Sequence, residues 1–195
     1  METASSIRRG TTIASEEADL IARSAGGDLD AYDRLVGLYQ DRVYQVAYRI
    51  TGNREDAWDA AQETFLSAFR SLPRFRGASA FSTWVHRIAA NAALDLIRRR
   101  PTHPLVSLED VTVSAGDDPA ETATRSELQR RIHRAITTLP ADQRVVVVLR
   151  DVQGLSYEEI AGVLRLPLGT VRSRLSRARE ALRRQLADLA PAAGA

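Results

Sequence analysis

The stretch SYEEIAGVLRLPLGTVRSRLSRARE, residues 156–180, decides the fold of the second half of this chain. Ser156 followed by Glu159 forms a capping box, which predicts the start of a short helix. Residues 166–169, LPLG, form a tight turn, and Thr170 lies at the start of a longer helix. A short helix, a tight turn and a longer helix predict a helix-turn-helix, which places its second helix in the major groove of DNA.

The second helix of this motif predicts one apolar and one polar face. Its apolar residues recur at spacings of four, three and four, as in one buried stripe: Val171, Leu175, Ala178 and Leu182. Serines lie on the opposite face, with arginines on that face and on its flanks. Small serine side chains let a helix approach the groove, while arginines reach phosphates or guanine edges. Residues 172–184 hold six arginines and one acid. A merely solvated face does not explain this excess, because like charges repel.

A second basic block covers residues 73–100, which carry six arginines and one acid. The pattern predicts a helix from about Ser82 to Arg100, ended by Pro101. One stripe of this helix lies well away from its apolar stripe and consists of Trp84, Arg87, Asn91 and Arg98. An exposed tryptophan beside arginine and asparagine can stack on a base and hydrogen-bond a base edge.

The aromatic residues of this block allow two interpretations. The preceding loop adds Phe75, Arg76, Ser79 and Phe81 within reach of the helix. In the first interpretation these residues and Trp84 contact nucleic acid. In the second, Trp84 and both phenylalanines fill the core, as most aromatic side chains do. The residue pattern favours neither.

Charge alternates along the chain, although the net charge is only +2. The net charge is −4 for residues 1–72, +5 for residues 73–100, −5 for residues 101–124 and +7 for residues 125–184. Two basic blocks separated by an acidic one indicate two surfaces for anionic partners, joined by a segment that binds to neither. All 27 basic residues are arginine. GC-rich coding explains this most simply, although guanidinium groups also suit phosphates and guanine edges.

The composition excludes several classes of function. The chain contains no cysteine, so disulfides, thiolate zinc sites and thiol redox sensing are excluded. The three histidines, His86, His103 and His133, lack metal-ligand spacing, and no glycine-rich phosphate loop or nucleophile elbow is present. We therefore expect no cofactor, no metal and no enzymatic activity. No apolar run approaches the roughly 18 residues of a membrane span, and no signal-peptide segment is visible, so we expect a cytoplasmic protein.

Helical periodicity predicts an all-α fold of two small helical domains joined by a flexible acidic linker, the second containing the helix-turn-helix. The expected segments are an N-terminal extension 1–14, a first domain 15–100, the linker 101–124, a second domain 125–189 and a tail 190–195. The linker contains three prolines, many small polar residues and five acids, a composition typical of flexible connections.

Helix ends are marked by glycine, asparagine and proline. A first helix is expected from about Ser15 to Ser24, and a second from about Leu29 to Ile50. Gly52 ends the second helix, Asn53 caps a third and Pro73 stops it.

The run VVVVL at residues 145–149 resembles a strand by composition. However, Pro140 and the acid-bearing ADQR after it indicate a helix start, and Gly154 indicates a C-cap. We therefore predict a helix.

Two motif blocks resemble a known family. The segment FRGASAFSTWVHRIAANAALDLIRRR, residues 75–100, resembles region 2 of the extracytoplasmic-function (group IV) sigma factors of bacterial RNA polymerase. The segment LPADQRVVVVLRDVQGLSYEEIAGVLRLPLGTVRSRLSRAREALRR, residues 139–184, resembles their region 4. The blocks occur in the family's order, and the resemblance covers about residues 15–188. A helix-turn-helix alone is shared with other regulators, whereas both blocks in one small chain are specific.

The resemblance implies a polymerase surface and two promoter contacts. The β′ coiled coil of core polymerase would bind helices within residues 29–72 through Asp56, Asp59, Gln62 and Phe65. The −10 element, with a flipped base held near the tryptophan, would contact Phe75, Arg76, Ser79, Phe81, Trp84, Arg87, Asn91, Arg98, Arg99 and Arg100. The −35 element would contact Ser156, Tyr157, Thr170, Arg172, Ser173, Arg174, Ser176 and Arg177. The second domain would also touch the β flap.

The family also implies regulation by a partner. Its members are usually held inactive by an anti-sigma factor and respond to stress or to the cell envelope. His86 and Ala90 depart from the family, which commonly has a tyrosine and a basic residue at these positions. The alternative to a sigma factor is a stand-alone helix-turn-helix regulator that binds duplex DNA as a dimer. No dimer seam is visible in the sequence, and this alternative leaves the first basic block unexplained.

Overall fold

A computed structural model of the chain describes residues 15–99 and 119–187. Every regular element in these two ranges is helical, which confirms the all-α prediction. None of the helices within them is long and apolar enough to cross a membrane. The predicted N-terminal extension, the predicted C-terminal tail, residues 101–118 of the predicted linker and Arg100 lie outside the described residues.

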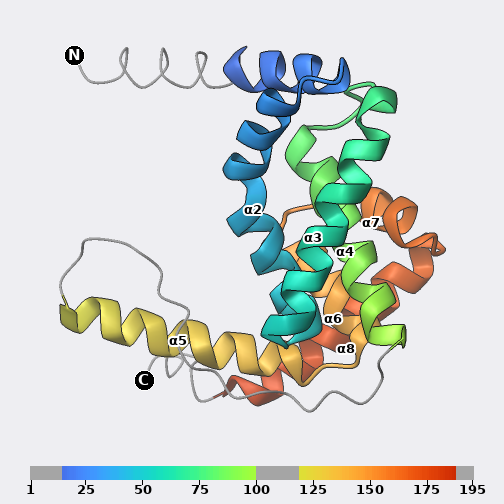
Figure 1. Ribbon diagram of the computed structural model, residues 1–195. Coiled ribbons are helices and arrows are strands. Elements are labelled where there is room, and N and C mark those ends of the chain that lie inside the picture. Colours follow the sequence, from blue (N-terminus) through green and yellow to red (C-terminus); the bar gives the residue numbers. More distant parts are fainter. Residues whose placement is uncertain (1–14, 100–118, 188–195) are drawn as a thin grey trace, which may run out of the picture.

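The elements follow one another as a chain of helices (Figure 1). After a helix over residues 15–25 come α2 (Leu29–Thr51), α3 (Arg54–Ser71), the 3-10 helix η1 (Leu72–Arg74), α4 (Phe81–Arg99), α5 (Pro119–Thr137), α6 (Ala141–Val147), the π-helix η2 (Val148–Val152), α7 (Tyr157–Leu164) and α8 (Leu168–Gln185). We call the part up to α4 the first unit and the part from α5 onward the second unit.

The predicted caps fix the helix ends of the first unit. Gly52 ends α2 in the left-handed region, with φ of 74°, and Asn53 caps α3 by accepting a hydrogen bond from the Asp56 backbone N–H. Helices α2, α3 and α4 pack against one another in pairs. Their core includes Val43 of α2 and Val85 of α4, which are fully buried. These contacts hold α4, which carries the first predicted DNA surface, against the other two helices.

The VVVVL run is helical, as predicted, and its five residues are all buried. A helix that is hydrophobic all round must have neighbours on all sides. The segment from α6 to η2 meets this requirement because it contacts α2 and α4 of the first unit as well as α8 of the second. The run therefore lies between the two units.

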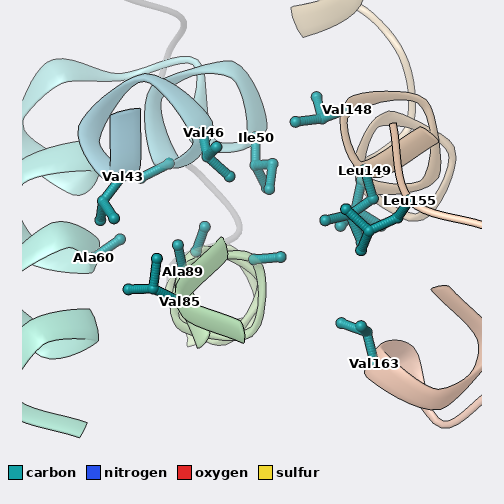
Figure 2. Packing of buried hydrophobic residues seen from close by; sticks show 14 of the residues in the cluster. Val43, Val46, Ile50, Ala60, Val85, Ala89, Val148, Leu149, Leu155 and Val163 are labelled. Atoms are coloured by element: carbon teal, nitrogen blue, oxygen red, sulfur yellow. The ribbon is translucent and has the colours of Figure 1, made fainter. Parts of the chain in front are cut away.

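The two units share one buried core. Figure 2 shows Ile50 of α2 facing Val148 of η2, with Leu149, Leu155 and Val163 beyond it in the second unit. At the margin, the rings of Tyr48 and His133 stack with centroids 4.4 Å apart. The sequence predicted two domains, and the structure adds that they pack together.

Helix α5 begins at Pro119, whereas the second domain was expected to start at about residue 125. Proline is favoured in the first turn of a helix, because the backbone N–H groups there have no acceptor within the helix and proline, which lacks an N–H, loses no hydrogen bond. The sequence reading placed this proline in the linker, so it missed a helix start. Figure 1 shows α5 as a long helix reaching from the loop before α6 to the edge of the molecule.

The turn of the helix-turn-helix contains a strained residue. Arg165 follows α7 in the left-handed region with φ of 52°, and it is the one such non-glycine residue among those described. A side chain with a Cβ is disfavoured there, whereas glycine is not.

We expect Arg165→Gly to raise the free energy of unfolding by about 1 kcal/mol. Thermal denaturation followed by circular dichroism measures this change. Arg165→Ala keeps the Cβ and is the control, so an equal gain with alanine would contradict the explanation.

Candidate nucleic-acid interface

The helix-turn-helix is built as the sequence predicts. The Ser156 hydroxyl accepts from the Glu159 backbone N–H, and the Glu159 carboxylate accepts from the Ser156 backbone N–H, so the capping box is complete. Helix α8 buries Val171, Leu175 and Ala178 against the rest of the unit. It begins at Leu168, two residues before the predicted start. The buried stripe orients the opposite face of α8 toward solvent.

That opposite face carries much of the predicted −35 contact set. The side chains of Arg172, Ser173, Ser176 and Arg177 are exposed. The Ser173 hydroxyl donates to the Thr170 carbonyl at 3.1 Å, which keeps the hydroxyl close to the helix surface. The two serines lie between the two arginines along the helix, and their small side chains leave room for the edge of a DNA groove.

The remaining predicted −35 residues are less open. Arg174 is half-buried, and its Nε lies 3.2 Å from the Asp142 carboxylate of α6. Ser156 and Thr170 are half-buried, and the Ser156 hydroxyl is already engaged in its cap. Arg174 therefore faces the seam between α8 and α6 rather than the exposed face of α8.

Tyr157 is held by two arginines, which sequence reasoning did not pair with it. The Arg150 guanidinium lies 5.0 Å from the centre of its ring and that of Arg172 lies 6.0 Å away. Both distances fit a cation–π contact, which orients the guanidinium over the ring. Tyr157 thus helps to position Arg172, a residue of the exposed face. Helical periodicity could not show this, because the three residues lie on different elements.

Arg179 was predicted only as a flanking charge of α8, and the structure gives it a partner. Asp151 of η2 receives two hydrogen bonds from its guanidinium, the one from Nε at 3.1 Å. The hydrogen bond and the charge of Asp151 raise the pKa of Arg179 above its ordinary value. Asp151 thus holds the guanidinium of Arg179 against η2.

Removing the Asp151 carboxylate tests whether it restrains the Arg179 side chain. We expect Asp151→Asn to free Arg179 for one more phosphate contact, so the slope of log K against log salt concentration steepens by about 1. Fluorescence anisotropy with a labelled DNA duplex over a salt series measures the slope. Asp19→Asn makes the same charge change in the first unit, where Asp19 pairs with Arg23. Equal steepening in that control would show that net charge, not Arg179, is responsible.

The aromatic residues before and on α4 come together. Trp84 packs against Phe75 and Phe81, with ring centroids 5.0 and 5.4 Å apart. Phe81 is buried and makes an edge contact with Tyr39 of α2. Trp84 and Phe75 are only half-buried. Phe81 therefore belongs to the core, while Trp84 and Phe75 have one side against it and one side toward solvent.

The polar residues of this block separate into two places. Asn91 and Arg99 line a hollow of about 390 Å³ between α3 and α4, together with Glu63 of α3. Arg98 lines a different cavity of about 360 Å³ at the seam with the second unit, which Arg174 also lines. The structure thus brings Asn91 close to Arg99 but not to Arg98.

The other residues of the block vary in exposure. Arg76 is exposed, whereas Ser79 and Arg87 are half-buried. The two departures from the family, His86 and Ala90, are both buried, so neither presents a side chain to DNA.

Helix α3 presents the residues predicted to bind core polymerase at different depths. Gln62 is exposed, Asp59 and Phe65 are half-buried, and Asp56 is buried in the first turn. The Phe65 backbone carbonyl accepts from the Tyr32 hydroxyl of α2, which ties α3 to α2 at this point. Sequence reasoning missed the large apolar side chains beside Gln62, which are exposed on the same helix: Trp58, Leu66 and Phe69.

Comparisons with known proteins agree with this geometry. Family sequence models match at residues 35–101 for "Sigma-70 region 2" and at residues 129–182 for "Sigma-70, region 4". The RNA polymerase sigma-H factor of Pseudomonas aeruginosa is 40% identical over 184 residues, covering 89% of this chain and 95% of that protein. The ECF RNA polymerase sigma factor SigW of Bacillus subtilis is 39% identical over 173 residues, covering 84% of this chain and 92% of SigW.

A solved structure shows the same fold. The sigma factor RpoE from Bartonella quintana, in complex with the anti-sigma factor NepR, is 25% identical with a TM-score of 0.60. The match covers 80% of this chain and 96% of that one.

A helical first unit with an aromatic and basic helix, followed by a helix-turn-helix with an arginine face, defines a DNA-binding transcription initiation factor. The chain belongs to the extracytoplasmic-function sigma factors of the sigma-70 family. It directs RNA polymerase to promoters and initiates transcription there.

Proposed function

We propose that the exposed face of α8 reads the −35 element and that α4 with its preceding loop engages the −10 element. The observation that carries this proposal is the position of the two arginine-bearing surfaces. Each lies in one of the two segments that match sigma-70 regions 2 and 4. The protein would act in the cytoplasm, where the chromosome lies, and would have no catalytic activity of its own.

At the −35 element, α8 would enter the major groove of duplex DNA. Within the predicted contact set of α8, Arg172 and Arg177 are the exposed side chains long enough to reach a guanine edge or a phosphate. Ser173 and Ser176 lie between them and permit close approach. Arg174 would contribute less to base contacts, because Asp142 holds it toward α6.

At the −10 element, the solvent-facing sides of Trp84 and Phe75 supply surfaces on which an unpaired base can stack. The hollow lined by Asn91 and Arg99 has a volume of about 390 Å³. This volume falls within the range of about 300–1,000 Å³ of small-molecule pockets, so the hollow could accept a flipped base. The Asn91 amide would then bond the base edge and Arg99 a nearby phosphate.

The exposed side of α3 would bind core polymerase. Gln62 supplies a polar contact, Asp59 a negative charge, and Leu66 and Phe69 the apolar area. Exposed side chains of this size are typical of protein–protein contacts when they occur side by side. The buried Asp56 would support this surface from beneath through the first turn of α3.

We also propose control by an anti-sigma factor. The solved RpoE structure from Bartonella quintana contains the anti-sigma factor NepR. Because this chain has no cysteine, any thiol-based sensing would belong to such a partner and not to the chain itself.

Transcription in a purified system tests the proposal. Core polymerase with this chain is expected to start transcripts on genomic DNA at sites that share −35 and −10 sequences. Sequencing the transcript ends identifies those sites. If core polymerase plus the chain never initiates, while the chain alone binds a palindromic duplex tightly, the protein is a stand-alone regulator instead.

A further inference from the structure

A buried arginine joins the ends of two helices from different units. Nη1 of Arg144, on α6, donates to the carbonyls of Ile50 at 2.6 Å and Thr51 at 3.3 Å. Nη2 donates to the carbonyl of Thr137, and to that of Leu139 at 3.0 Å. Thr51 is the last residue of α2 and Thr137 the last of α5. One guanidinium therefore contacts the C-terminal ends of both helices.

This arrangement satisfies carbonyls that a helix cannot satisfy itself. The last four carbonyls of a helix lack intrahelical donors and carry the negative end of the helix dipole. The planar fork of an arginine can donate to several of them at once. Arg144 is only 9% exposed, so water cannot easily replace the guanidinium at these carbonyls.

The packing of the two units also limits the distance between the two proposed promoter surfaces. In this closed arrangement α4 of the first unit contacts α6 and α7 of the second. A compact body of about 150 residues has a radius of gyration of about 15 Å and is therefore about 40 Å across. The −35 and −10 positions differ by about 25 base pairs, or about 85 Å of duplex at about 3.4 Å per base pair. The closed form is too short to reach both elements.

We propose that Arg144 is a clasp that holds the free chain closed by capping α2 of the first unit from the second. The two promoter surfaces separate only when its bonds to Ile50 and Thr51 break. The clasp itself does not depend on the proposed DNA contacts. Only its consequence for promoter binding rests on the proposed function.

Distance measurement between the units tests the clasp. The native chain has no cysteine, so Asp33→Cys on α2 and Glu158→Cys on α7 can be spin-labelled without further changes. Both positions are exposed. Pulsed electron paramagnetic resonance on the free chain is expected to give one narrow, short distance. In the same labelled chain, Arg144→Ala is expected to move at least half of the molecules to a longer and broader distribution.

Arg150→Ala is the matched control. Arg150 donates to the Leu155 carbonyl at 2.7 Å, so its loss removes an arginine–carbonyl bond within the second unit alone. The short distance should persist in this variant. If Arg144→Ala loses its helical circular dichroism, Arg144→Gln replaces it. The glutamine amide in this variant can still donate to a carbonyl of its own unit, but it lacks the second donating nitrogen of the arginine guanidinium.

Several results would overturn the clasp. They are a long, broad distribution in the unsubstituted free chain, a short distance retained by a folded Arg144 variant, and equal opening by Arg150→Ala. Unfolding of both Arg144 variants would also contradict it, since Arg144 would then support the second unit itself rather than the seam. The measurement contains neither DNA nor polymerase, so failure of the promoter assignments would leave its result unaffected.

Discussion

Replacing Arg172 and Arg177 together by glutamate is expected to abolish transcription from a −35/−10 promoter while the chain stays folded. Both side chains are exposed on α8, and neither contributes to the buried stripe beneath them. Loss of one base-contacting arginine costs about 1–3 kcal/mol of binding, and each glutamate adds repulsion from the phosphates. The combined loss should exceed a hundredfold in promoter binding by the polymerase holoenzyme.

The control for this result lies on the same helix. Arg183→Glu with Arg184→Glu makes the same change of charge at the C-terminal end of α8, outside the predicted contact set. Run-off transcription and holoenzyme binding to the promoter should fall far less in this control. Equal losses in the two variants would mean that α8 contributes only a general positive charge and does not read the −35 element.

Leu149→Ala is expected to lower the free energy of unfolding by about 2–5 kcal/mol, the usual cost of removing a fully buried leucine. Leu149 is 0% exposed and belongs to η2, which contacts both α2 and α7. A cavity at this point loosens the helix-turn-helix and the seam together. Urea denaturation followed by circular dichroism measures the change.

Leu128→Ala on α5 is the control for the same deletion at a surface position. Leu128 is 44% exposed, so its loss should change stability by no more than about 0.5 kcal/mol. If Leu149→Ala cost as little as Leu128→Ala, the shared core would not contribute to the stability of the chain.

The local parts of the fold were predictable because their causes are local. The capping box at Ser156 and the caps at Gly52 and Asn53 involve residues within a few positions of one another. The helical VVVVL run was predictable from Pro140 before it and Gly154 after it. Its burial on all sides was also visible in principle, since five consecutive apolar residues leave no polar face.

The other parts of the fold and of the site depend on contacts between distant residues, which helical periodicity does not reveal. The pairing of Arg179 with Asp151 joins residues 28 positions apart, and the bond from Arg144 to Ile50 joins residues 94 apart. A helical wheel shows which face a residue occupies but not which distant group faces it. For the same reason the sequence left Trp84 between two interpretations, and the structure gives it one side against the core and one toward solvent.

The position of the VVVVL run between the units has a consequence for solubility. When the units separate, the α2- and α4-facing side of residues 145–149 loses its cover. A short β-branched segment without charge is the kind of sequence that pairs with copies of itself to form cross-β aggregates. An open chain waiting for polymerase therefore carries an aggregation hazard that the closed chain does not. Packing of the two units against each other would thus protect the protein from aggregation as well as keep the two promoter surfaces too close together to bind a promoter.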